Sequence, residues 1–198
     1  ACAPYRRLHL CHHNLESIDT TSTTHKLLLE VCMAAYYEGQ SIKDDHAQYR
    51  AKYPDTNSQL CTVLARSFAD IGDIVRGKDL YRGNNRENDK LEKKLKEYFK
   101  KIYDNLVEKK EEAKDYYKDT TNYYELREDW WELNRETVWK AITCNAQGNR
   151  YFRATCGDEQ NKSTLAKNNC RCNGTNANQV PTYFDYVPQY LRWFEEWA

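Results

Sequence analysis

Apolar positions in the first third of the chain recur at intervals of three and four residues, the spacing of a helix with one buried face. One helix is predicted over residues 24–39, with Thr24 as its N-cap and Gly39 as its C-terminal stop. A second, shorter helical stretch covers residues 41–53 and ends at the sequence PDTNS. The inward positions of the first helix are Leu28, Val31 or Cys32, Ala35 and Tyr36.

The segment ARSFADIGDIVRG, residues 65–77, is predicted to form the second half of a third helix. Its charged residues Asp70, Asp73 and Arg76 fall at the spacing complementary to the apolar stripe, so we expect them to face away from the core. Gly77 is expected to end the helix. The inward stripe consists of Leu60, Leu64, Phe68, Ile71 and Val75.

Three more helices and a loop complete the pattern. A long helix with a solvent face of lysine and glutamate is predicted over residues 86–118, and another helix over residues 124–142. The inward stripe of the latter is Leu126, Trp130, Leu133, Thr137 and Ala141, widened by Trp131, Val138 and Ile142. Residues 143–178 lose periodicity and hold four cysteines, which predicts a disulfide-stapled loop. Pro188 then opens a final helix. The shared face of that helix contains Tyr190 or Leu191, Phe194 and Trp197.

The chain shows no internal repeat and no convincing strand alternation, so the predicted fold class is all-α, a disulfide-stabilised helical bundle. Thirty Lys and Arg balance thirty Asp and Glu, which leaves no global field to attract nucleic acid or an anionic membrane. No apolar run reaches the roughly 20 residues that cross a bilayer. The opening ACAPYRR contains no signal-like region, as expected for a piece of a longer protein.

The even number of cysteines in a chain of this size favours disulfides and an oxidising compartment. Our preferred pair is Cys32 with Cys61, because both lie on the inward stripes of consecutive helices. Such a bridge would contribute roughly 2 to 4 kcal/mol. The remaining connectivity stays open. The cysteines expected to form disulfides are Cys2, Cys11, Cys32, Cys61, Cys144, Cys156, Cys170 and Cys172.

Catalytic patterns are weak throughout the sequence. A zinc site can be imagined, but its spacing fits no strong zinc signature. Its ligands would be Cys156, Cys170, Cys172 and either His12 or His13. The sequence CHH, residues 11–13, offers the only thiol next to a base, and neighbouring residues rarely point together. No glycine-rich phosphate loop, HExxH motif or nucleophile elbow occurs. We therefore expect no catalytic residue, metal or cofactor, and a zinc-dependent or thiol enzyme is the least favoured alternative.

Local basic clusters are the candidates for binding, since each could hold the sulfate or carboxylate groups of a glycan. For the lysines of the long helix, the alternative is a soluble charged face that interspersed glutamates neutralise. The cluster at the end of the third helix is less neutralised. The clusters are Arg6 and Arg7; Arg76, Lys78 and Arg82; and Lys93, Lys94, Lys96, Lys100 and Lys101.

Four blocks of the sequence together resemble one family. They are ACAPYRRLHLC (1–11), ARSFADIGDIVRG (65–77), REDWWELNRETVWKAITC (127–144) and DYVPQYLRWFEEWA (185–198). They are similar to the Duffy-binding-like domain, alpha type, of the Plasmodium falciparum variant erythrocyte membrane proteins, over essentially the whole chain. The resemblance implies a helical, disulfide-linked fold in three subdomains. Residues 1–60 would supply part of subdomain 1 and the first helices of subdomain 2, residues 61–198 mainly subdomain 2, and the third subdomain would be absent.

The resemblance also implies adhesion rather than catalysis. The expected partners are a host cell-surface receptor, either a sulfated glycan of the heparan sulfate type or a red-cell protein, and host antibodies. The expected location is the extracellular face of the infected erythrocyte, with the membrane reached only through a segment of the parent protein. Binding to heparan sulfate and other red-cell receptors would serve rosetting, and residues 76–182 would form a variable region that antigenic variation exploits. The alternative function is a structural scaffold and immune decoy that positions neighbouring binding domains.

Overall fold

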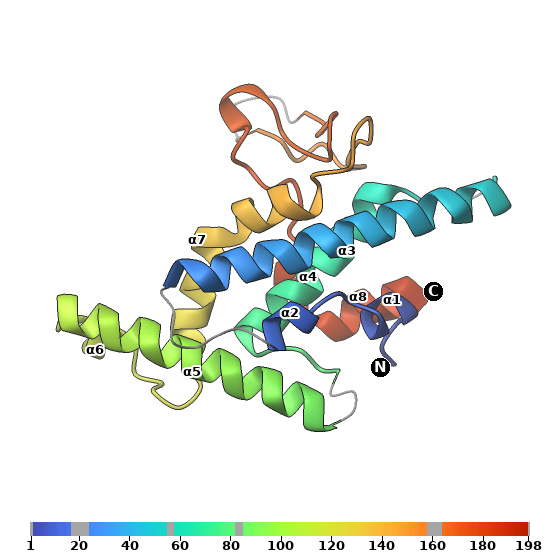
Figure 1. Cartoon of the computed structure of the whole chain (residues 1–198). Helices are drawn as coiled ribbons and strands as arrows, with labels where there is room; N and C mark the ends of the chain where they lie inside the picture. Colours follow the sequence, from blue (N-terminus) through green and yellow to red (C-terminus); the bar gives the residue numbers. More distant parts are fainter. Residues whose placement is uncertain (1, 17–23, 55–57, 82–84, 158–163, 198) are drawn as a thin grey trace.

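The computed structural model describes residues 2–16, 24–54, 58–81, 85–157 and 164–197. Within them the regular structure consists of helices, together with two isolated bridges and no strand. The all-α prediction is therefore confirmed. Figure 1 shows the long helices crossing one another, with an irregular segment above them and both chain ends on one side. None of the described helices is long and apolar enough to cross a membrane.

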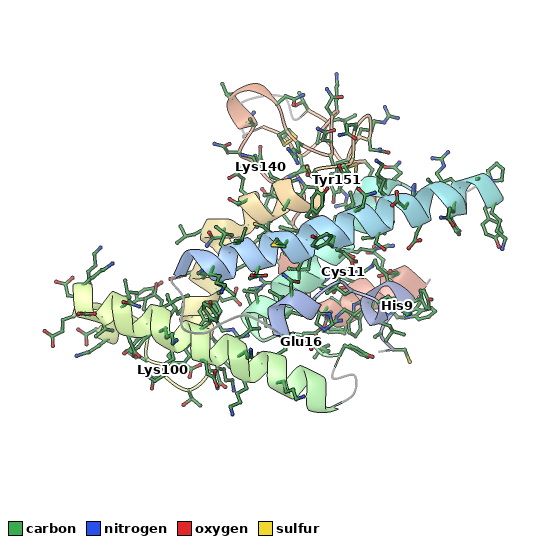
Figure 2. All side chains as sticks on the ribbon, in the orientation of Figure 1. His9, Cys11, Glu16, Lys100, Lys140 and Tyr151 are labelled. Atoms are coloured by element: carbon green, nitrogen blue, oxygen red, sulfur yellow. A yellow bond between two sulfur atoms is a disulfide. The ribbon has the colours of Figure 1, made fainter. Side chains whose placement is uncertain are left out.

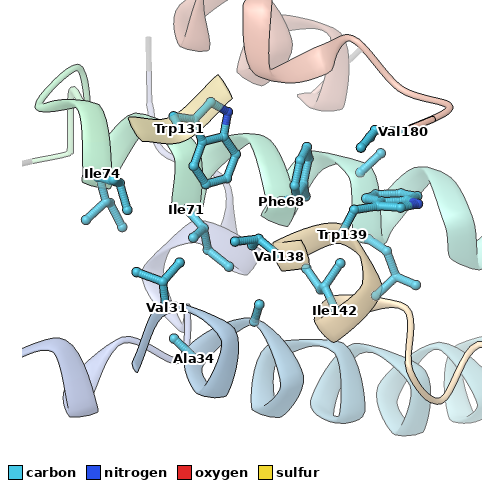
Figure 3. Packing of buried hydrophobic residues seen from close by; sticks show 14 of the residues in the cluster. Val31, Ala34, Phe68, Ile71, Ile74, Trp131, Val138, Trp139, Ile142 and Val180 are labelled. Carbon is cyan, nitrogen blue, oxygen red and sulfur yellow. The ribbon is translucent and has the colours of Figure 1, made fainter. Parts of the chain in front are cut away.

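Three helices form the core: α3 (Thr24–Lys52), α4 (Leu60–Arg76) and α7 (Tyr124–Ile142). Phe68 of α4 lies at their centre, with its ring centroid 5.1 Å from that of Trp131 and 5.2 Å from that of Trp139, both on α7 (Figure 3). All three aromatic side chains are buried. Such large, tilted aromatic contacts contribute more than their buried area alone.

Helix α3 runs without a break through Gly39, so the predicted stop there is wrong. A Cβ atom at Gly39 would lie 2.0 Å from the carbonyl oxygen of Ile142, at the end of α7. Glycine is therefore present because the two backbones approach closely, and not because the helix ends. The predicted inward face is also shifted, since Tyr36 is 40% exposed while Val31 and Ala35 are buried.

Helix α4 is buried on nearly every side, and the expectation that its charged residues face away from the core is wrong. Asp70, Asp73 and Arg76 are 0%, 4% and 1% exposed. The reason is that α3 and α7 cover one side of α4, whereas η2 (Phe184–Tyr186) and α8 (Gln189–Trp197) cover the other. Gly77 ends the helix as predicted, in the left-handed conformation with a φ of 74°.

The long lysine-rich helix is α5 (Asn85–Lys109), which ends nine residues before the predicted residue 118. Residues 108–112 are all exposed, so no apolar contact extends the helix, and the short α6 (Ala113–Tyr116) follows. The bounds of α7 agree with the prediction. Its predicted stripe is wrong at Leu133, which is 82% exposed, and at Thr137, which is also exposed, because the buried side of α7 runs through Arg135 and Trp139 instead.

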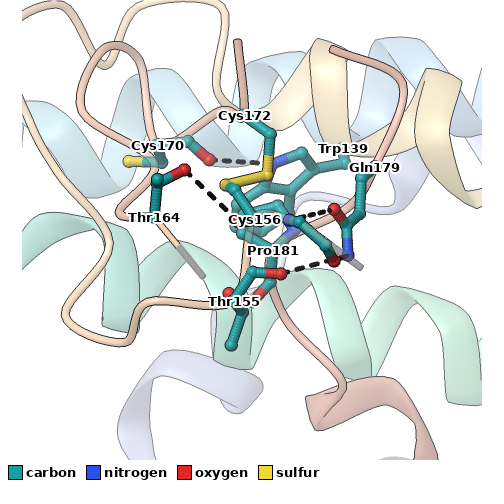
Figure 4. Close-up of a disulfide and its surroundings, with 9 residues drawn as sticks. Trp139, Thr155, Cys156, Thr164, Cys170, Cys172, Gln179 and Pro181 are labelled. Carbon is teal, nitrogen blue, oxygen red and sulfur yellow. Dashed lines mark hydrogen bonds between the residues drawn. A yellow bond between two sulfur atoms is a disulfide. The ribbon is translucent and has the colours of Figure 1, made fainter. Parts of the chain in front are cut away.

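Two disulfides hold the irregular segment after α7, so the prediction of a disulfide-stapled loop is confirmed. Cys61 of α4 bonds to Cys170, and Cys156 bonds to Cys172. In Figure 4 the second bridge lies above Trp139, whose indole nitrogen donates a hydrogen bond of 3.0 Å to the carbonyl of Cys170. The segment also contains η1 (Gly174–Asn176).

The predicted bridge between Cys32 and Cys61 is wrong. Cys32 lies 20 residues before Lys52 at the end of α3, which is about 30 Å along an unbroken helix. Cys61 is in the first turn of α4, just past the connection between the two helices. The expectation that every cysteine is bridged is also wrong for half of the set. The cysteines with free thiols are Cys2, Cys11, Cys32 and Cys144.

The final helix presents the opposite side from the one predicted. Trp193 and Arg192 are buried, whereas the expected inward residues are exposed. The reason is that Arg192 reaches the carboxylates of α4, and this ionic contact sets the rotation of α8. The exposed apolar residues of α8 are Tyr190, Leu191, Phe194 and Trp197.

Candidate functional site

The structure divides the predicted basic residues into an internal group and a surface group. Arg76 belongs to the internal group, because it is only 1% exposed. Its guanidinium donates to the carbonyl of Gly72 at 3.0 Å, to the Asp73 carboxylate at 3.0 Å and to the carbonyl of Asp185 at 2.6 Å. Arg76 is therefore a structural residue that no surface ligand contacts.

The cluster expected around Arg76 does not form a common surface in the described part of the chain. Lys78 is exposed and pairs with Glu128 of α7, which also lies 3.5 Å from Arg76. Arg82 lies outside the described residues. Of the two members of the cluster that the structure describes, Lys78 is the one at the surface, and a carboxylate already contacts it.

Arg6 belongs to the internal group as well, in a network that ties both ends of the chain to α4. Its guanidinium lies 2.7 Å from Asp70 and donates two hydrogen bonds to Glu196, at 3.0 and 2.9 Å. Arg192 of α8 lies 2.7 Å from Asp70 and 2.5 Å from Asp73. This network holds α1 (Tyr5–Leu8) and α8 on the same side of α4 (Figure 1).

The two carboxyl groups of this network titrate in opposite directions. Burial alone would raise the pKa of Asp70, but the charges of Arg6 and Arg192 outweigh it and hold that pKa below its ordinary value. For Asp73, burial dominates and raises the pKa to about 6, despite Arg192 and Arg76. The negative charge of the neighbouring Asp70 acts in the same direction as burial on Asp73, so Asp73 is the carboxyl group that retains its proton more readily.

The lysines of α5 form the surface group. Lys93, Lys100 and Lys101 are exposed, and the side chain of Lys96 is 36% exposed. Figure 2 shows the side chains of α5 spreading outward from the bundle, with Lys100 labelled. A hydrogen bond to Asp104 raises the pKa of Lys100, so this lysine stays protonated. We call Lys93, Lys94, Lys96, Lys100 and Lys101 the lysine face of α5.

The lysine face carries a local excess of positive charge. Between Lys90 and Lys101 the chain has six lysines and two glutamates, and Asp104, just beyond, pairs with Lys100. One of those glutamates, Glu92, is held on both carboxylate oxygens by Arg127, at 2.8 and 2.9 Å. Arg127 is fully buried and also donates to the carbonyls of Ile74 and Val75 at the end of α4. Arg127 therefore compensates the charge of Glu92 from inside the fold. Glu92 also lies 4.0 Å from Lys96.

The inner side of α5 fixes the orientation of these lysines. Leu91, Leu95, Tyr98 and Phe99 are buried, at the spacing of one side of a helix. The ring of Phe99 packs against that of Trp130 with centroids 6.0 Å apart. Because the apolar side is anchored, the lysines cannot rotate away from the solvent.

The described residues contain no group of side chains that could hold a metal ion. The imagined zinc ligands Cys156, Cys170 and Cys172 are all in disulfides, so they cannot coordinate zinc. Burial and the nearby Glu38 raise the pKa of the Cys11 thiol to about 11, and burial raises that of Cys32 to about 11. These thiols stay protonated near neutral pH and are poor nucleophiles.

Sequence reasoning missed the buried ionic network and Arg127 entirely. A periodic pattern assigns charged residues to the solvent side, so nothing in it marks Asp70 or Arg192 as internal. The available signal is that α4 has apolar residues around most of its circumference, which leaves no wide polar side for charges. A helix of that kind is buried, and its charges then require buried partners.

The chain matches the family model of the Duffy binding domain over residues 1–192. Curated proteins provide no match to it. Among solved structures, it is 46% identical to the NTS-DBL1(alpha-1) domain of PfEMP1 from the Plasmodium falciparum varO strain, with a TM-score of 0.79, covering 100% of this chain and 43% of that one. The double domain of NTS-DBL1-alpha and CIDR-gamma from the same strain is also 46% identical, with a TM-score of 0.78, covering 100% of this chain and 27% of that one. The PfEMP1 IT4var13 DBLbeta domain bound to ICAM-1 is 31% identical, with a TM-score of 0.70, covering 100% of this chain and 44% of that one.

The chain thus spans less than half the length of each of these solved chains. The likeness confirms both the family resemblance and the helical, disulfide-linked fold. Duffy-binding-like domains are adhesion modules and not enzymes, which agrees with the expectation of a non-catalytic chain. From the family model and from 46% identity over its whole length, the chain belongs to the Duffy binding domain family.

Proposed function

We propose that this chain is a host-cell adhesion module that binds a sulfated glycan of the heparan sulfate type through the lysine face of α5. The corresponding location is the extracellular face of the infected erythrocyte, as part of a PfEMP1-type protein. Support for adhesion comes from the family and from a relative whose structure contains bound ICAM-1. For ligand choice, the support comes from the charge on α5.

The single observation that carries the proposal is the ratio of six lysines to two glutamates between Lys90 and Lys101, with Glu92 held by Arg127. Sulfate groups on a linear glycan attract such a row of ammonium groups. The exposed charges act over a Debye length of about 8 Å at physiological ionic strength. Neighbouring lysines on one helix therefore act together on a chain of sulfates, and binding weakens with added salt.

Heparin affinity of charge-reversed variants tests this proposal. The double variant Lys93→Glu and Lys101→Glu should bind heparin at least tenfold more weakly than the unmodified chain. A matched control, Arg50→Glu with Lys52→Glu, makes the same change in net charge at the exposed end of α3. It should bind within about twofold of the unmodified chain, because the altered charges lie outside the lysine face. Equal losses in both variants, or binding that added salt does not weaken, would refute the assignment to α5.

A scaffold that positions neighbouring binding domains is the second candidate function. The exposed apolar side of α8 favours it, since contiguous exposed apolar residues mark contact surfaces between proteins. A screen of correctly folded chain against sulfated glycans and red-cell surface proteins separates the two candidates. Binding supports the adhesion module, whereas a uniformly negative screen supports the scaffold.

A further inference from the structure

A cavity of about 300 Å³ lies beneath the lysine face, between the N-terminal segment, the residues that follow α4, the inner side of α5 and the start of α7. Arg7 and Lys96 are its basic residues, and Tyr81 and Tyr124 are its aromatic residues. The other lining residues are Ile74, Gly77, Asp79, Leu91, Glu92 and Leu95. A volume of this size is at the low end for small-molecule sites, so it suits one small unit of a ligand.

Arg7 lines this cavity, and one buried nitrogen of its guanidinium has no hydrogen-bond partner among the described residues. The residue is 1% exposed, and its Nε and Nη2 atoms donate to the two oxygens of Asp79, at 3.2 and 2.5 Å. Its Nη1 atom makes no hydrogen bond within the described residues. Nε and Nη2 share one edge of the planar guanidinium, so Nη1 points away from Asp79. A buried charged donor left without an acceptor is costly, which favours a ligand that supplies one.

The charge around the cavity favours an anion. The lining holds two basic residues, Arg7 and Lys96, and two carboxylates, Asp79 and Glu92, and Arg127 pairs with Glu92 from outside the lining. Both of those carboxylates are already held, by Arg7 and by Arg127. The basic residue of the lining that is least compensated is therefore the half-buried Lys96, which lies 4.0 Å from Glu92.

Two tyrosines give the cavity the apolar surface that a sugar ring needs. The guanidinium of Arg7 lies over the ring of Tyr81, 5.0 Å from its centroid. Tyr124 opens α7 and is 43% exposed, so its ring reaches both the cavity and the solvent. An aromatic ring next to charged donors can cover the apolar side of a sugar while the donors hold its anionic group.

We propose that this cavity binds one anionic sugar unit, whose sulfate or carboxylate group accepts hydrogen bonds from Arg7 and Lys96. The inference rests on the proposed function, because the sugar unit would belong to the glycan that the lysine face binds. The cavity would then hold that glycan at one fixed position. A sulfate ester and a uronate carboxylate share the chemistry that Arg7 recognises, and the test separates them.

Calorimetric titration of the 198-residue chain with a sulfated heparin disaccharide tests the cavity, since a disaccharide is too short to follow the lysine face. We expect one disaccharide per chain. Lys96→Gln should lower the affinity about tenfold, the loss of one charge-assisted hydrogen bond. Lys101→Gln, the matched control on the same helix, should change it less than twofold. Arg7→Lys keeps the charge beside Asp79 and should abolish measurable binding, and the Lys96 variant decides the matter if that protein does not fold.

Two further probes identify the anionic group. Binding of the desulfated disaccharide points to the carboxylate, and its failure to bind points to the sulfate ester. Inorganic sulfate that binds as tightly as the disaccharide would reduce the site to an adventitious ion only and overturn the sugar assignment. Equal effects of Lys96→Gln and Lys101→Gln would overturn it as well.

Heparin polymer, titrated in parallel, keeps the two proposals distinguishable. If the polymer binds and the disaccharide does not, the cavity is excluded while the lysine face stands. If the disaccharide binds with the expected dependence on Lys96 while charge reversal at Lys93 and Lys101 leaves polymer binding unchanged, the lysine face fails and the cavity stands.

Discussion

Replacing Gly39 with alanine tests the close approach of α3 to α7. In an ordinary helix interior this change is favourable, by about 1 kcal/mol. Here the added Cβ would lie 2.0 Å from the carbonyl oxygen and 2.9 Å from the carbonyl carbon of Ile142, whereas ordinary contact begins at 3.4 Å. The helices would have to separate by more than 1 Å at a point where backbone meets backbone.

The size of the effect follows from these two opposing contributions. Overpacking of a core costs roughly 1 to 3 kcal/mol, and a rigid backbone neighbour places this site at the upper end. After the helix propensity of alanine is subtracted, we expect Gly39→Ala to lower the free energy of unfolding by about 2 kcal/mol. For a chain of this length, that corresponds to a fall in Tm of about 4 to 8 °C.

Equilibrium unfolding in urea, followed by circular dichroism, measures the change. Ser41→Ala is the matched control, because Ser41 is exposed two residues further along the same helix. It gains helix propensity without any clash, so its free energy of unfolding should rise by a few tenths of a kcal/mol. If Gly39→Ala were as stable as the unmodified chain or more so, the reasoning about the helix contact would be refuted.

Three further changes probe other parts of the structure. Replacing Cys61 and Cys170 by alanine opens a loop of 109 residues and should cost about 4 to 5 kcal/mol in chemical denaturation, and a cost below about 1 kcal/mol would contradict the covalent anchoring of the loop. The raised pKa of Asp73, about 6, means that the folded chain keeps a proton between pH 4 and 6 that the unfolded chain releases, so this group contributes stability that is lost as pH rises through 6. Asp73→Asn should remove that component of the pH dependence of unfolding, and identical slopes in both proteins would exclude it. Trp193→Ala should lower the free energy of unfolding by about 3 to 5 kcal/mol and Phe194→Ala by less than about 0.5 kcal/mol, and thermal melts giving the reverse order would show that α8 is rotated.

Helix content and the bounds of α7 followed from the sequence, because they depend on local periodicity, whereas α3 was split at Gly39 and α5 was extended to residue 118. The stripe of α4 from Leu60 to Val75 and the full extent of α7 appear in the structure as the spacing predicted. Gly77 was identified correctly as a cap because a helix end is a local event. Gly39 was misread for the same reason: local rules offered a stop, whereas the cause of that glycine lies in another helix.

Long-range contacts were the part that periodicity could not supply. The partner of Cys61 lies 109 residues away, and no spacing rule connects the two. The predicted inward side of α8 was wrong because Arg192 is buried in an ion pair with Asp70, 122 residues earlier. A hydrophobic pattern contains no information about such a pair. For the candidate site, the lysine face was visible in the sequence, but the cavity beside it required Arg7 and α5 to be brought together by the fold.

The pairing of α8 with α4 has a consequence for synthesis of the chain on the ribosome. Asp70 and Asp73 precede Arg192 by 122 and 119 residues. At roughly 5 to 20 residues per second, translation needs about 6 to 24 s to supply that guanidinium. During this interval the carboxylates of Asp70 and Asp73 lack the guanidinium of Arg192, so their burial in the apolar core is unfavourable. Helix α4 therefore reaches its final burial only after α8 has been made.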